Sequence, residues 1–86
     1  MHANAHAVTH TLNLDVCYGT EGLDVALADL VKGTNVAAAP TGVRAGGGWP
    51  EVKFTGSRAD LTVVAARYAG GEPDDLDDLL SYIKVA

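Results

Sequence analysis

Three histidines near the amino terminus recur at every fourth position, as His2, His6 and His10. On a helix or an extended strand this spacing brings the imidazoles to one face, where they can bind a transition metal. No cysteine or carboxylate completes a set with the spacing of a zinc site. We therefore expect no metal and no cofactor. Residues 1–6 are interpreted as a flexible tail in front of a single domain that covers residues 7–86.

The only cysteine, Cys17, lies between a predicted strand and a predicted helix. A thiol near a helix amino terminus can become a nucleophile when its pKa is lowered, but nucleophilic catalysis also needs a base. His10 falls on the opposite face of the predicted strand. An inert, half-buried Cys17 is the simpler interpretation, so we predict that the protein is not an enzyme. The alternative is a small enzymatic or ligand-binding ferredoxin-like dimer that uses Cys17, Tyr18 and His10.

Residues 41–50, TGVRAGGGWP, form a glycine-rich connection that we interpret as the tip of a hairpin. A phosphate-binding loop would need a lysine followed by serine or threonine and then a helix, whereas Trp49, Pro50 and a strand follow here. Arginine and tryptophan are enriched at interaction hot spots, so Arg44 and Trp49 are candidate partner-binding residues. The simpler interpretation of Trp49 is that it folds onto the core as a main aromatic anchor.

Five acidic residues gather near the carboxyl terminus: Glu72, Asp74, Asp75, Asp77 and Asp78. Such a cluster can bind a basic partner or mimic the phosphates of nucleic acid, although aspartates are also ordinary at the start and on the polar face of a helix. The spacing of a calcium-binding EF-hand loop is absent. Asp74, Asp75, Asp77 and Asp78 are therefore candidate partner-binding residues, and an acidic decoy of a DNA-binding protein is an alternative function.

The composition limits the classes of partner. A chain of 86 residues with a net charge of −5 fits one domain and lacks the excess of basic residues that nonspecific nucleic-acid or anionic-membrane binding needs. There is no apolar run of about 20 residues and no secretory signal. A single cysteine makes no internal disulfide, so we expect a cytoplasmic protein. Only five aromatic residues are present, and so thin a core favours a homodimer.

Hydrophobic periodicity predicts the elements that position these residues. Strict alternation predicts a strand over 7–18, and apolar residues at helical spacing predict a helix over 21–32 that ends at Gly33. A short strand over 35–39 is expected to stop at Pro40. Alternation resumes over 51–55, with Val52 and Phe54 directed inward.

The segment 58–69 fits two structures. Ser57 as an amino-terminal cap, apolar residues at helical spacing and a stop at Gly70-Gly71 favour a helix. The β-branched run 62–64 favours a strand, but Arg67 would then fall on an apolar face. We predict the helix. A last helix opens at 72–73 and carries an apolar stripe up to Ile83, with Lys84 in its final turn.

These elements predict an α+β fold, a variant of the ferredoxin-like (split β-α-β) arrangement. The element order is β-α-β-β-α-α, with an antiparallel sheet and helices on one face. The complete fold has a fourth strand beside the first, and the pattern provides none. An exposed strand edge must be covered or paired. The last helix or a second copy of the chain is expected to cover it.

The phrase GGGWPEVKFTGSRADL, residues 46–61, resembles a strand-to-helix phrase of small actinobacterial and actinobacteriophage accessory proteins. Their composition, rich in alanine, glycine, valine and aspartate, is similar as well. The resemblance covers about a fifth of the chain, and it implies a phage-encoded protein that acts inside a bacterial host. The function we predict is a noncatalytic protein–protein interaction module, a modulator of a bacterial host protein.

Overall fold

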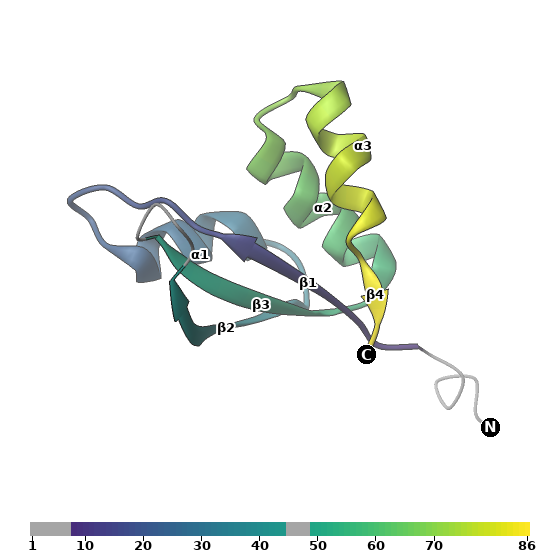
Figure 1. Ribbon diagram of the computed structural model, residues 1–86, viewed down its shortest axis with the longest axis horizontal. Coiled ribbons are helices and arrows are strands. Elements are labelled where there is room, and N and C mark those ends of the chain that lie inside the picture. Colours follow the sequence, from purple (N-terminus) through teal and green to yellow (C-terminus); the bar gives the residue numbers. More distant parts are fainter. Residues whose placement is uncertain (1–7, 45–48) are drawn as a thin grey trace.

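The computed structural model describes residues 8–44 and 49–86 (Figure 1). Its elements are β1 (His10–Asp15), α1 (Leu23–Val31), β2 (Ala37–Arg44), β3 (Pro50–Gly56), α2 (Arg58–Ala69), α3 (Pro73–Ser81) and β4 (Lys84–Val85). The strands form one antiparallel sheet in the order β2-β3-β1-β4. This order is that of the ferredoxin-like fold, so the predicted fold class is confirmed. The predicted tail, with His2 and His6, lies outside the described residues.

The core lies on the face of the sheet that the helices cover. Alternation along β1 brings Leu12 opposite Phe54, and Leu14 opposite Val52, in the antiparallel register with β3. Leu12, Phe54 and Val52 are fully buried, while the residues between them point to the other face. Helix α2 closes this core with Leu61, Val64 and Ala65, all fully buried. The predicted inward face of both strands is therefore confirmed, although β1 itself is shorter than the predicted 7–18.

Helix α2 has the bounds that the sequence predicts. The Ser57 hydroxyl accepts a hydrogen bond from the Asp60 backbone N–H at 3.1 Å, which satisfies one of the free donors of the first turn. At the other end Gly70 adopts a left-handed conformation with φ of 64°, which glycine accepts without a steric cost. The strand alternative for this segment is wrong, because burial of one helical face outweighs the β-branched run.

The sequence predicted that this strand would stop at Pro40, but β2 continues to Arg44. Successive residues of an antiparallel strand direct their backbone groups to opposite sides. The Val16 N–H donates to the Pro50 carbonyl at 3.0 Å, so Val52, two residues on, also directs its backbone groups toward β1. Pro40 lies opposite Val52, and its missing N–H therefore faces the open edge of the sheet. An edge strand tolerates proline there.

The sheet has a fourth strand, which the hydrophobic pattern of the sequence does not predict. Helix α3 ends at Ser81, so Lys84 belongs to a strand and not to the last turn of a helix. Lys84 and Val85 pair with the start of β1, and the Ala86 N–H donates to the Thr9 carbonyl at 2.9 Å. The end of the chain, and neither α3 nor a second copy, thus covers the start of this edge. The predicted homodimer stays a prediction.

Helices α1 and α3 are attached less firmly than α2. Neither contains a buried residue. Helix α3 lies beside α2 and away from the sheet (Figure 1). The apolar residues of both helices are only partly buried against the core: Leu23, Ala26, Leu27, Leu30 and Val31 on α1, and Leu76, Leu79 and Leu80 on α3. The apolar stripe of α1 therefore remains partly exposed to solvent.

Candidate functional site

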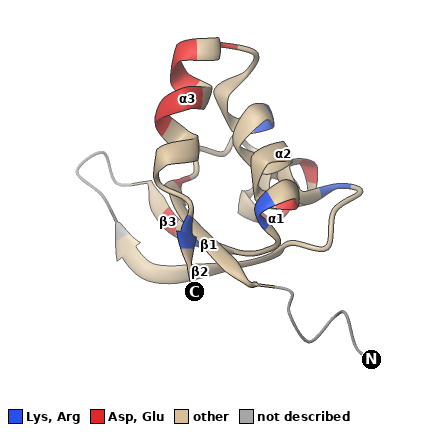
Figure 2. Ribbon diagram, turned by 90° about the vertical axis from the view of Figure 1, so that its right-hand side faces the viewer, with Lys and Arg blue, Asp and Glu red and all other residues tan. Residues whose placement is uncertain are grey.

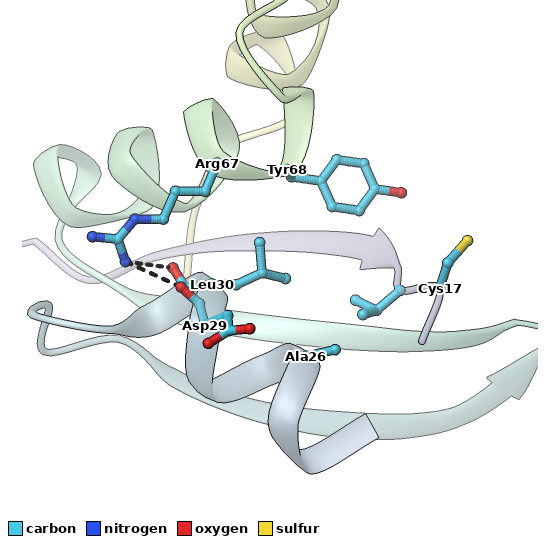
Figure 3. A pocket seen from close by; sticks show the side chains of 7 residues that line it. Cys17, Ala26, Asp29, Leu30, Arg67 and Tyr68 are labelled. Atoms are coloured by element: carbon cyan, nitrogen blue, oxygen red, sulfur yellow. Dashed lines mark hydrogen bonds between the residues drawn. The ribbon is translucent and has the colours of Figure 1, made fainter. Parts of the chain in front are cut away.

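A groove of about 480 Å³ lies between α1 and α2, at the carboxyl end of β1 (Figure 3). Its volume is in the range of about 300–1,000 Å³ that ligand pockets occupy. We call it the α1–α2 groove. It is lined by Val16, Cys17, Ala26, Asp29, Leu30, Arg67 and Tyr68.

Three elements position these side chains. Val16 is almost fully buried just after β1 and joins the groove to the core. On α1, Ala26 and Leu30 are four residues apart and therefore share one helical face. The small side chain of Ala26 leaves the space open. Arg67 and Tyr68 come from the last turns of α2, where they extend across to α1 and β1 (Figure 3).

Arg67 ties α2 to the carboxyl end of α1. Its Nη1 donates to the backbone carbonyls of Asp29 at 3.4 Å, Leu30 at 3.1 Å and Lys32 at 2.6 Å. The last carbonyls of a helix have no partner within the helix, and the negative end of its dipole attracts a cation. Arg67 therefore caps α1 from another helix.

Tyr68 ties α2 to the end of β1. Its hydroxyl donates to the Asp15 carbonyl at 2.5 Å. This bond satisfies a backbone group on the edge of β1 that β4 does not reach. Burial raises the pKa of Tyr68, and electrostatic repulsion from Cys17 and Asp15 raises it further. All three effects disfavour the phenolate, so the neutral form that donates the bond is the one the fold holds.

The raised pKa of Tyr68 makes its contribution to stability depend on pH. A folded-state pKa above the ordinary value of about 10 gives a contribution that is complete below that value and is lost as pH rises through the folded pKa. Tyr68→Phe should lose about 1 kcal/mol at neutral pH, and the difference from the parent should shrink above about pH 10. Urea unfolding at a series of pH values measures this. Tyr82→Phe, at an exposed tyrosine, is the matched control and should change stability little at neutral pH.

Cys17 is exposed, so the predicted half-buried state is wrong. It lies between the α1–α2 groove and a second hollow of about 350 Å³, lined by residues 17–22 together with Val25, Ala26 and Asp29. His10 is seven residues away along extended chain, which is roughly 20 Å, and its Nδ1 is 3.2 Å from the Val8 carbonyl. Cys17 and its sequence neighbour Tyr18 both line the second hollow, whereas His10 lies apart from them.

Trp49 is not the core anchor that the simpler interpretation expected. Its side chain is 40% exposed, and the buried aromatic residue of the core is Phe54. The Trp49 ring packs edge-to-face on Tyr18, with centroids 5.5 Å apart and an interplanar angle of 73°. Because Tyr18 lines the second hollow, Trp49 extends the same surface. Only the backbone of Arg44 is described, and residues 45–48 of the predicted hairpin tip lie outside the described residues.

The acidic residues of the last helix form a separate surface. Asp74, Asp75, Asp77 and Asp78 are all exposed on α3, where Figure 2 shows them in red. None of them lines either hollow. The structure therefore divides the predicted partner-binding residues between two places.

Arg67, Tyr68 and Asp29 line the groove but were not candidate residues. Among residues 8–44 and 49–86, no group of three or more histidines, cysteines or acidic residues is placed to hold a metal ion. In that part of the chain, every helix is too short or too polar to cross a bilayer. Comparison of the chain with models of known protein families, with curated proteins and with solved structures found no match.

Proposed function

We propose that the chain is a noncatalytic module that binds another protein through one continuous surface. This surface consists of the α1–α2 groove, the second hollow beside it and the Trp49 ring. The observation that carries the proposal is the exposed Trp49, which packs on Tyr18 beside the two hollows. Tryptophan and tyrosine supply much of the energy of protein interfaces, most of all when they lie next to a pocket.

The geometry of the aromatic pair favours binding. An edge-to-face contact holds the indole ring in one orientation. A ring that is already held in place loses less conformational freedom on binding. The hollows next to it offer a place for a side chain of the partner, which is the usual pairing of an anchor with a pocket at a hot spot.

The proposed partner is a bacterial protein. The resemblance of residues 46–61 to actinobacteriophage accessory proteins supports this choice, and a modulator of a host protein is the corresponding role. The exposed acidic face of α3 offers a second contact, and a net charge of −5 favours encounter with a basic surface.

Trp49→Ala should weaken the complex by about 30-fold or more, since truncation of a hot-spot residue costs about 2 kcal/mol or more. Affinity capture from an actinobacterial lysate identifies the partner, and calorimetry on the purified pair gives the Kd. Tyr82→Ala is the matched control, because Tyr82 is 57% exposed and lines neither hollow. Equal affinities for Trp49→Ala and the parent chain would show that the surface lies elsewhere.

A further inference from the structure

We infer that the α1–α2 groove binds a bulky apolar side chain that is flanked by a positively charged one. The inference rests on the proposed function and defines the partner further. Its binding segment would carry an apolar residue, such as leucine or phenylalanine, next to lysine or arginine.

The apolar part follows from the floor of the groove. Val16 is 2% exposed and belongs to the core, while Leu30 and Ala26 are only partly buried on the open stripe of α1. The Tyr68 ring forms the facing wall and is 38% exposed. A bulky apolar side chain placed there would remove these surfaces from water, which is the main favourable term in association.

The positive charge follows from the rim. Asp29 lines both hollows, and Glu21 lines the second one; both side chains are exposed. These two carboxylates place negative charge at the mouth.

Arg67 does not cancel this charge. Among the described residues that line either hollow, it alone is basic. Its Nη1 already binds three carbonyls at the negative end of α1, so much of its charge is balanced by the helix dipole. In Figure 3 its remaining nitrogens point away from Tyr68 and Cys17. An anionic group in the groove would therefore meet the Asp29 carboxylate and an arginine whose Nη1 is already bonded to α1.

Three small probes with the same phenyl ring separate charge from apolar contact: phenethylamine, 2-phenylethanol and phenylacetate. Each is titrated into the ¹⁵N-labelled chain, and the shifts of the backbone amide signals are followed by NMR. Phenethylamine should shift the signals of Ala26, Leu30 and Tyr68 at the lowest concentration. Phenylethanol should follow, and phenylacetate should bind most weakly.

Asp29→Asn should weaken phenethylamine binding by about two- to fivefold, as expected for one exposed charge pair, and should leave phenylethanol binding nearly unchanged. Asp77→Asn is the matched control, because Asp77 is exposed on α3 and lines neither hollow. The amide spectrum of each variant without a probe shows that its fold is intact.

Three results would overturn the inference: phenylacetate binding as tightly as phenethylamine, shifts confined to α3, or no shift with any probe. The two proposals can fail separately. If no probe binds in the groove but Trp49→Ala still weakens the protein partner, the groove is not the anchor site and the proposed function stands. If phenethylamine binds as expected but Trp49→Ala leaves the complex unchanged, the groove takes a cationic ligand and the proposed interface is wrong.

Discussion

Replacing Phe54 by alanine should remove most of the stability of this protein. The side chain is fully buried and lies opposite Leu12 on β1 and Ala38 on β2 in the sheet register. Truncation of a core phenylalanine costs about 3–5 kcal/mol, whereas a whole domain is stable by about 5–15 kcal/mol. A chain of this size is expected near the lower end of that range. Urea unfolding followed by circular dichroism measures the loss.

Two variants show whether the effect comes from the core. Phe54→Leu keeps an apolar side chain in the same place and should lose clearly less than Phe54→Ala. Val43→Ala truncates a valine that is 56% exposed on β2, and it should change stability by no more than about 0.5 kcal/mol. A loss for Phe54→Ala as small as that for Val43→Ala would show that the sheet does not pack around Phe54.

The core could be predicted from the sequence because it depends on local periodicity. Leu12 and Leu14 on β1 and Val52 and Phe54 on β3 alternate with polar residues, and alternation fixes which face is buried. Helix α2 was predictable since its cap, Ser57, and its stop, Gly70, directly flank the helix in the sequence. In these segments, local signals and tertiary packing favour the same structure.

Two features of the sheet could not be predicted because they depend on partners distant in sequence. A strand of two residues, Lys84–Val85, has too few positions to show alternation, and its conformation follows from pairing with Thr11 and His10. The effect of Pro40 depends on whether its backbone groups face β3 or solvent. That is a property of the register and the strand order.

The groove was not predictable for the same reason. Arg67 bonds to carbonyls 35 to 38 residues earlier in the chain, and Tyr68 bonds to one 53 residues earlier. Within α2, the sequence shows Arg67 only as a polar residue near the helix end. Trp49 was a candidate, but its two interpretations differ in burial, which is set by where Tyr18 lies and not by the residues next to Trp49.

Arg67→Ala should release α1 while the rest of the fold persists. Three carbonyls at the end of α1 lose their donor, and α1 has no buried residue to compensate. Hydrogen bonds to a charged group are worth about 1.5–3 kcal/mol when buried. Water replaces the lost donor at this exposed site, so we expect a loss of about 1–2 kcal/mol.

Hydrogen exchange locates this loss. Amides of α1 should lose protection in Arg67→Ala, whereas those of β1, β3 and α2 should keep most of theirs, because regions with few buried contacts open first. Arg67→Lys should restore protection only in part, since an ammonium is a point charge without the planar fork of a guanidinium. Arg58→Ala is the control, as Arg58 is exposed in the first turn of α2. An equal loss of protection across the sheet would contradict a local role.

The same variant separates two roles of Arg67 at the groove. If Arg67 acted there mainly as a positive charge, its removal would strengthen the binding of phenethylamine, because a repelling charge is gone. If it acts by holding α1, its removal should weaken the binding of all three phenyl probes, since Ala26 and Leu30 form part of the floor of the groove and move with α1. We expect the second result. Because α1 has no fully buried residue and its carboxyl end is bonded to Arg67, the geometry of the groove depends in part on a residue of the opposite helix.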